Sequence, residues 1–133
     1  MANEYGLTIL GHVAHPERRL EVFPSRSRPG ALSVRLHCHE FTCRCPVTGQ
    51  PDWAKITIDY VPDELVVESK SMKLYLETYR EQGIFHEHLA QAILDDLTAA
   101  AKPLQASVTV DFNVRGGIAI SATATYQRPQ GVA

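Results

Sequence analysis

Apolar and polar residues alternate along two stretches in the first half of the chain, and this pattern predicts β-strands. In residues 31–41, one face carries Leu32, Val34, Leu36 and Cys38, and the other carries Ser33, Arg35, His37 and His39. In residues 53–60, the apolar face consists of Ala54, Ile56, Ile58 and Tyr60. Because neighbouring side chains of a strand point to opposite sides, each strand should bury one face. Residues 41–53 are rich in turn formers, so we expect a long loop that joins the two strands into a hairpin.

The period of the pattern changes in the middle of the chain, where it predicts two helices. Residues 69–83 carry an apolar stripe at helical spacing, formed by Met72, Tyr75, Leu76 and Tyr79. Ser69 is a suitable N-cap for this helix, and Gly83 is a suitable end. Residues 84–103 carry a second stripe, formed by Phe85, Leu89, Ala92, Ile93 and Leu97. Pro103 closes the second helix, because proline cannot continue the hydrogen-bond ladder.

Two further alternating stretches, residues 105–114 and 118–126, predict a second hairpin after the helices. Its turn contains Arg115-Gly116-Gly117, and adjacent glycines favour the tight turns of hairpins. Shorter extended segments are expected at 18–24 and 65–68. The order of the main elements is β-β-α-α-β-β, which predicts an α+β fold with an antiparallel sheet and both helices on one face. Such a sheet has two open edges, so we expect subunits to pair them in a homo-oligomer.

Length and composition agree with one globular domain. The chain has 133 residues, of which 44% are hydrophobic and 21% are charged, enough to form a core. We expect residues 1–133 to form one domain, with an N-terminal extension and loop at 1–30. The net charge of -2 argues against nonspecific binding of nucleic acid. We see no signal peptide and no membrane span, so we expect a cytoplasmic protein with reduced cysteines.

Cys43 and Cys45 lie in the turn-rich stretch, a few residues before Asp52. A cysteine attacks as a thiolate, and the group that it attacks often needs a proton from a nearby acid. Cys45 and Asp52 are therefore a candidate nucleophile and general acid. Two other interpretations stay open. The first is that these loop cysteines have no function. The second is a zinc site formed by Cys38, His39, Cys43 and Cys45, although their spacing lacks the paired motifs of structural zinc sites.

Polar residues also gather at the predicted start of each helix. The first group would either hold an anionic ligand at a helix N-terminus or form a solvated face, and it consists of Glu68, Ser69, Lys70 and Lys73. In the second group, His86 is a candidate proton carrier and Glu87 is able to accept two N–H bonds from a guanine-like ring. An acidic residue is favoured in a first helical turn without any function. Arg115 is either a phosphate ligand or simply solvated.

Four motifs together resemble the QueF family: CPVTGQPD at 45–52, ESKSMKLYL at 68–76, FHE at 85–87 and RGG at 115–117. The resemblance runs in order from Leu32 to Tyr126, and ESKSMK is its most specific part. Family members are NADPH-dependent reductases that convert 7-cyano-7-deazaguanine to the 7-aminomethyl compound on the path to queuosine in tRNA. The resemblance implies the tunnelling fold, whose subunits assemble into barrels. For this short, single-domain type it implies a decamer of two pentameric rings.

The resemblance also implies a role for each matching residue. Cys45 would add to the nitrile carbon and form a covalent thioimide, Asp52 would protonate the nitrogen, and His86 would join them in catalysis. The residues expected to bind substrate are Val67, Glu68, Ser69, His86 and Glu87. The residues expected to bind NADPH are Ser69, Lys70, Ser71, Arg115 and Gly116. No metal is implied, and sites in this family form between subunits, so these groups need not meet within one chain.

Two alternatives stand beside the reductase. One is a cofactor-independent relative that uses the same cysteine on the same nitrile to form an amidine, and the ESKSMK and RGG segments argue against it. The other is a purine-binding module without turnover, and the presence of both Cys45 and Asp52 argues against that. The chain has no G-x-G-x-x-G fingerprint, so NADPH must be held without a Rossmann motif. Lys70 and Arg115 are reasonable partners for its phosphates, and we expect Cys38 and Cys43 to be structural.

Overall fold

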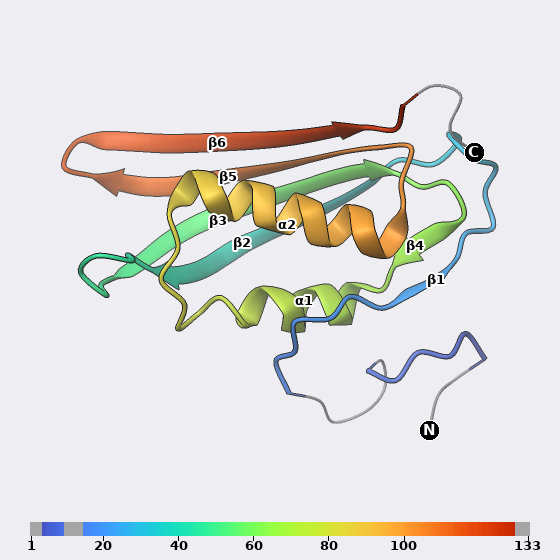
Figure 1. Cartoon of the computed structure of the whole chain (residues 1–133), viewed down its shortest axis with the longest axis horizontal. Helices are drawn as coiled ribbons and strands as arrows, with labels where there is room; N and C mark the ends of the chain where they lie inside the picture. The colour runs from blue at the N-terminus through green and yellow to red at the C-terminus, as the bar shows by residue number, and fades with distance from the viewer. Residues whose placement is uncertain (1–3, 10–14, 130–133) are drawn as a thin grey trace.

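A four-stranded antiparallel sheet forms the framework of the protein (Figure 1). The computed structural model describes residues 4–9 and 15–129, so the predicted extension at 1–30 lies partly outside the described residues. The strand order is β2-β3-β5-β6, with β2 at Val34–Arg44, β3 at Pro51–Val61, β5 at Gln105–Arg115 and β6 at Ile118–Gln127. Both predicted hairpins are confirmed, because β2 pairs with β3 and β5 pairs with β6.

Two helices, α1 (Ser69–Glu77) and α2 (His86–Ala101), cover one face of this sheet and confirm the predicted order (Figure 1). The core lies between the two layers, and its fully buried members include Ile56, Ile58, Val108, Val110, Leu89, Ile93 and Leu97. The buried stripe predicted for the second helix was wrong at Phe85. This residue has extended backbone angles as the N-cap of α2, so it falls outside the helical period and is half exposed.

The loop predicted at residues 41–53 is much shorter in the structure. Strand β2 continues to Arg44 and β3 begins at Pro51, so Cys43 lies within the sheet. A β-bulge between Cys38 and Phe41 explains the error, because an extra residue changes which side chains face the core. Cys38 packs against the core before the bulge, and Phe41 and Cys43 do so after it. No single alternating pattern therefore runs through the whole strand.

Helix α1 begins at Ser69, as predicted, but its cap is Glu68 rather than Ser69. The Glu68 carboxylate accepts hydrogen bonds from the backbone N–H groups of Lys70 and Ser71, at 2.7 and 2.8 Å. These groups have no partner inside a helix, and a negative charge is favoured at the positive end of the helix dipole. The buried carboxylate of Glu68 therefore fixes the start of α1.

The end of α1 also differs from the prediction, since the helix stops at Glu77 and not at Gly83. Tight turns continue the chain to Gln82, and the carbonyl of Gln82 then accepts the N–H of Arg44. Gly83 passes closely against the loop between β2 and β3, where a Cβ on this residue would lie 3.0 Å from the Cα of Pro46. The glycine is thus required by a close approach of two backbones, and it does not cap the helix.

A small second sheet joins the two short extended segments that were expected at 18–24 and 65–68. It pairs β1 (Val22–Pro24) with β4 (Leu65–Val67), just before α1. At the other end of the molecule, the β5–β6 hairpin turns through Gly116 and Gly117, with φ of +58° and +81°, as a tight hairpin turn requires. The main sheet ends in β2 on one side and β6 on the other. Among the described residues no further strand pairs with either edge, and β2 is bridged only at Arg44, by Gly83.

Candidate active site

Cys45 lies in the loop at 45–50, which the backbone holds tightly. The N–H of Cys45 donates to the carbonyl of Gln50 at 2.8 Å, and the N–H of Gly49 donates to the carbonyl of Cys45 at 2.9 Å. Arg44 braces the loop, because its guanidinium donates both to the carbonyl of Gly49 and to the carboxylate of Glu81. The thiol is partly exposed. The loop therefore presents Cys45 in a defined position that a ligand is able to reach.

The three thiols of the chain differ in acidity. Hydrogen bonds from the side chain and backbone of Thr48 lower the pKa of Cys45 to about 7, against burial and the negative charge of Asp52. Burial raises the pKa of Cys43 to about 12, and the charges of Asp52 and Cys45 act in the same direction. Burial also raises the pKa of Cys38. Because the thiolate is the nucleophile, Cys45 is the one cysteine of the three that is prepared to attack near neutral pH.

Asp52 is buried at the start of β3, with 1% of the residue exposed. Its Oδ1 accepts a hydrogen bond from the guanidinium of Arg115. Its Oδ2 lies 3.3 Å from Nε2 of His86. A carboxyl group in contact with an imidazole is able to exchange a proton with it. The buried carboxyl group of Asp52 is therefore held between a guanidinium and an imidazole.

His86 is fixed at the first residue of α2 by a neighbour from the sheet. Its imidazole stacks on the ring of Phe112 in β5, with the ring centroids 3.5 Å apart and an angle of 7° between the planes. Phe112 is buried and was not among the predicted site residues. The available signal was its place on the apolar face of an alternating strand. Glu87 follows His86 and is exposed, so its carboxylate is open to a ligand.

Arg115 reaches Asp52 from the last position of β5, next to Gly116 in the hairpin turn. Its side chain is 45% exposed, although it is paired with a buried carboxylate. The family resemblance implies that Arg115 binds the cofactor, and its ion pair with Asp52 was not predicted. The two partners are 63 residues apart in the sequence, and only the pairing of β3 with β5 brings them together.

The remaining predicted residues, Val67 to Ser71, lie at the other end of α1 (Figure 1). Ser69 is exposed and Lys70 is partly exposed, whereas the rest of the segment is buried. The nine residues of α1 rise by about 1.5 Å each, so the helix alone is about 13 Å long. The structure therefore brings Cys45, Asp52, His86 and Arg115 together and leaves the segment 67–71 apart from them.

A pocket of about 490 Å³ lies between α1 and the open edge of the sheet at β2. Ser69 and Lys73 line it from the helix, and Cys38 and Trp53 line it from the sheet. Its lining residues do not include Cys45, Asp52 or His86. The pocket thus runs along α1 from Ser69 to Glu77, while the groups that are able to react lie outside its lining in the single chain.

The part of the chain that the structure describes contains neither a cluster of metal ligands nor a helix suited to cross a membrane. Within residues 4–9 and 15–129, no group of three or more His, Cys, Asp or Glu side chains is placed to hold a metal ion. The alternative zinc site therefore has no cluster there, and Cys43, one of its four candidate ligands, is turned into the core. None of the helices in these same ranges has the length and apolar character to cross a bilayer.

Known proteins resemble the chain over most of its length. The family model described as QueF-like protein matches residues 51–131. A protein of Frankia casuarinae named NADPH-dependent 7-cyano-7-deazaguanine reductase is 58% identical over 123 residues, which cover 92% of this chain and 97% of the relative. The chain belongs to the QueF family. The resemblance inferred from the four motifs is thereby confirmed.

Two further comparisons place this QueF protein among its relatives. A protein of Syntrophus aciditrophicus with the same name is 51% identical over 123 residues, covering 92% of this chain and 88% of the relative. Among solved structures, the archaeosine synthase QueF-Like in the apo form has a TM-score of 0.68 at 27% identity. The match covers 74% of this chain and 95% of that one. The predicted tunnelling fold is confirmed at the level of the single chain.

Proposed function

We propose that this QueF protein is an NADPH-dependent reductase that converts the nitrile of 7-cyano-7-deazaguanine to the aminomethyl group. The named relatives support this substrate and cofactor. Within this chain, the strongest support is Cys45, whose pKa is lowered to about 7 in the loop that leads directly to buried Asp52. The product would serve queuosine synthesis, and we expect the reaction to take place in the cytoplasm.

The proposed chemistry starts from the thiolate. The Sγ of Cys45 adds to the nitrile carbon and forms a C–S bond, while the nitrile nitrogen takes a proton from Asp52, which gives a covalent thioimide. His86, 3.3 Å from Asp52, exchanges protons with this carboxyl group. Two NADPH molecules, bound one after the other, would each supply one hydride, as a four-electron reduction requires. Cys45 would leave as a thiolate after the first hydride transfer, which gives an imine that takes the second hydride.

Residues at the start of α1 and at the end of β5 fit the phosphate groups of NADPH. Ser69 and Lys70 offer a hydroxyl and a cation at the start of the helix, and Arg115 offers a second, partly exposed cation. Cations of this kind form strong, charge-assisted hydrogen bonds with phosphate oxygens. Ser71 is fully buried in the single chain, so we expect it to stabilise the start of α1 without direct contact with the cofactor.

We further propose that a complete site needs a second copy of the chain. The group around Cys45 and the segment 67–71 lie at opposite ends of α1 (Figure 1), and both edges of the sheet are open. Large apolar side chains are also exposed in the strands and turns around the Cys45 end, namely Trp53, Phe85, Val114 and Ile118. A homo-oligomer would cover this surface and bring the two groups together. The decamer implied by the resemblance is one such assembly.

Subunit mixing tests the shared site. The variants Cys45→Ala and Lys70→Ala should each be inactive, but a mixture of the two after subunit exchange should recover activity, because some sites would combine an intact cysteine with an intact lysine. Each variant mixed with itself is the control. Failure of the mixture to recover activity, with exchange verified by native mass spectrometry, would place the site within one chain.

Consumption of NADPH that depends on the nitrile tests the reaction itself. The proposal requires two NADPH for each 7-aminomethyl product, and no consumption without the nitrile. The structural likeness to an archaeosine synthase QueF-Like protein keeps amidine formation as the second candidate. Consumption of the nitrile and ammonia without NADPH would show that the protein forms an amidine. Binding of the nitrile without either reaction would show that the protein is a binding module.

A further inference from the structure

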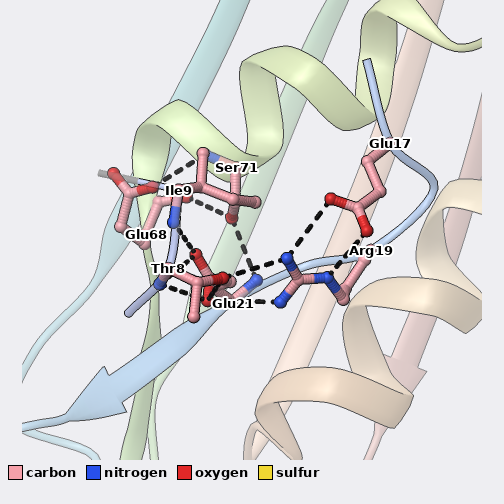
Figure 2. Close-up of polar contacts among 7 residues, drawn as sticks. All are labelled: Thr8, Ile9, Glu17, Arg19, Glu21, Glu68 and Ser71. Atoms are coloured by element: carbon pink, nitrogen blue, oxygen red, sulfur yellow. Dashed lines mark hydrogen bonds and ion pairs between the residues drawn. The ribbon is translucent and has the colours of Figure 1, made fainter. Parts of the chain in front are cut away.

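Glu21 is a buried acid that ties together the N-terminal segment and the start of α1 (Figure 2). Its side chain is 6% exposed. The carboxylate accepts hydrogen bonds from the backbone N–H groups of Thr8 and Ile9, at 2.8 and 2.7 Å, and from the hydroxyl of Thr8 at 3.0 Å. It also pairs with the guanidinium of Arg19 at 3.2 Å. A buried carboxylate with this many donors is fully satisfied.

These contacts also set the charge of Glu21. Burial alone would raise the pKa of the carboxyl, but hydrogen bonds from Thr8 and Ile9 and the cation of Arg19 together lower it below the usual value. The side chain of Glu21 is therefore ionised, and in this form it binds the backbone of residues 4–9. Leu7 and Ile9, on either side of Thr8, are both buried, so this segment is packed against the protein and does not hang from it.

The backbone of Glu21 reaches the start of α1 at the same point. Its N–H donates to the hydroxyl of Ser71 at 3.0 Å, and its carbonyl accepts the N–H of Glu68 at 2.8 Å. The hydroxyl of Ser71 in turn donates to the carbonyl of Glu68 at 2.7 Å. Figure 2 shows Thr8, Ile9, Glu68 and Ser71 arranged around Glu21. One residue thus joins the N-terminal segment to the cap that begins α1.

We propose that Glu21 is a positioning residue, which clamps residues 4–9 across the start of α1 and so holds Glu68, Ser69 and Lys70 in place for substrate and NADPH. The inference rests on the proposed function, because the role of this segment comes from there. Glu21 itself has no surface from which to touch a ligand and acts through its neighbours. Since Cys45 lies at the other end of α1, loss of the clamp should change ligand binding and leave the thiol alone.

Glu21→Gln is the most informative variant. It keeps the size of the side chain but removes the charge, and it replaces one acceptor oxygen by an NH2 group. At the Oε1 position this NH2 would face the N–H groups of Thr8 and Ile9, and at the Oε2 position it would face donors of Thr8 and Arg19, so donors face donors in either orientation. We expect KM for NADPH and for the nitrile to rise by about tenfold or more, as for the loss of a hydrogen bond to a charged group. The turnover number should change much less, and the rate at which iodoacetamide alkylates Cys45 should stay the same.

Glu17→Gln is the matched control. Glu17 lies on the same segment and pairs with the same arginine, but its side chain is half exposed, and within the described part of the chain its carboxylate bonds to Arg19 and not to the start of α1. Its kinetic constants should stay at the wild-type values. Glu21→Gln with both KM values unchanged would overturn the proposal. A fall in turnover and in Cys45 alkylation together, in parallel with a loss of stability, would overturn it too, because it would indicate general unfolding.

Hydrogen exchange supplies a readout that does not depend on the reaction. In the full-length protein, Glu21→Gln should speed exchange of the backbone amides of Lys70 and Ser71 by about tenfold or more, with Glu17→Gln unchanged. Equal exchange in wild type and Glu21→Gln would overturn the clamp even if the protein does not reduce the nitrile. If Glu21→Gln fails to fold, Thr8→Pro removes one N–H donor at an exposed residue, and faster exchange at the same two amides is expected. Unchanged exchange in Thr8→Pro would overturn the proposal.

Discussion

Cys43 and Asp52 are direct partners in the register of β2 and β3. This pairing places the buried carboxylate of Asp52 on the helix-covered side of the sheet. Its partner Cys43 precedes Cys45 by two residues, and β2 ends between them at Arg44. From there Asp52 meets Arg115 of β5 and His86 of α2. The short loop between the strands therefore has a structural purpose, which is to return the chain so that an acid stands beside a reactive thiol.

The first prediction concerns the pH dependence of cysteine alkylation. Because the pKa of Cys45 is lowered to about 7, its reaction with iodoacetamide should accelerate as the pH rises through about 7 and level off above it. Cys43, with a pKa raised to about 12 by burial, should stay unmodified in the folded protein. Trypsin cleaves after Arg44 and separates the two cysteines, so peptide mass spectrometry measures each rate. Equal rates for both would contradict this account.

Thr48→Val tests the cause of the low pKa. The side chain of Thr48 is the largest contribution that lowers the pKa of Cys45, so its removal should move the midpoint of the alkylation profile upward, towards the ordinary thiol value of 9.0. Alkylation and turnover at neutral pH should both fall. Thr98→Val, which removes a hydroxyl bonded within α2, is the control. A midpoint that did not move would show that Thr48 does not tune the thiol.

Asp52→Asn should preserve the fold and slow the chemistry. The amide keeps the shape of the carboxyl but cannot deliver the same proton, so turnover should fall by roughly 10²- to 10⁴-fold, while the nitrile still binds. Steady-state kinetics and titration of the nitrile separate the two effects. Asp59→Asn is the matched control, because Asp59 is also paired with an arginine but lies on the surface. An unchanged rate in Asp52→Asn would remove this residue from the mechanism.

Gly83→Ala should displace the loop at 45–50 that carries Cys45. A Cβ at residue 83 would lie 3.0 Å from the Cα of Pro46, and backbone cannot yield as a flexible side chain does. We expect a loss of about 1–3 kcal/mol in the free energy of unfolding and slower alkylation of Cys45. Gly30→Ala, which is strained by its φ of +84° but does not touch the loop, should lose stability with no change in alkylation. Equal alkylation in both variants would contradict the idea that Gly83 supports the loop.

Glu87→Gln should weaken binding of the nitrile substrate. Glu87 is exposed in the first turn of α2, and the family resemblance implies that it accepts the N–H groups of the guanine-like edge. Loss of that charged acceptor should raise Kd for the nitrile about tenfold or more, measured by titration calorimetry. Stability should fall by less than about 1 kcal/mol, the usual value of a charge near a helix end. Asp95→Asn on the same helix is the control, and an intact affinity in Glu87→Gln would end the recognition role.

Much of the fold could be predicted from the sequence, because the residues that face the core repeat with the period of their element. The buried residues of β3 and α2 show this, and so does the turn at Gly116 and Gly117. The bulge in β2 could not be seen, since an extra residue leaves no mark on composition and only reverses the alternation beyond Cys38. The cap of α1 by Glu68 was missed because serine, the residue type at position 69, is a much commoner N-cap than glutamate.

The candidate site was predicted less completely than the fold. Cys45 and Asp52 are close in sequence, and a structured loop between them was foreseeable. The contacts of Asp52 with Arg115 and of His86 with Phe112 join residues that only sheet pairing and helix packing bring together. Glu21 gave no signal, because a single acid in a mixed segment looks like any surface residue. The assigned roles of the segment 67–71 stay predictions.

The most direct test of the central claim is the intact mass of the protein after incubation with 7-cyano-7-deazaguanine and no NADPH. The account predicts a mass increase equal to that of the nitrile in the wild type and in Cys43→Ala, and no increase in Cys45→Ala. Addition of NADPH should then remove the adduct and release the amine. An adduct that persists in Cys45→Ala, or nitrile-dependent consumption of NADPH by that variant, would contradict the assignment of Cys45 as the nucleophile.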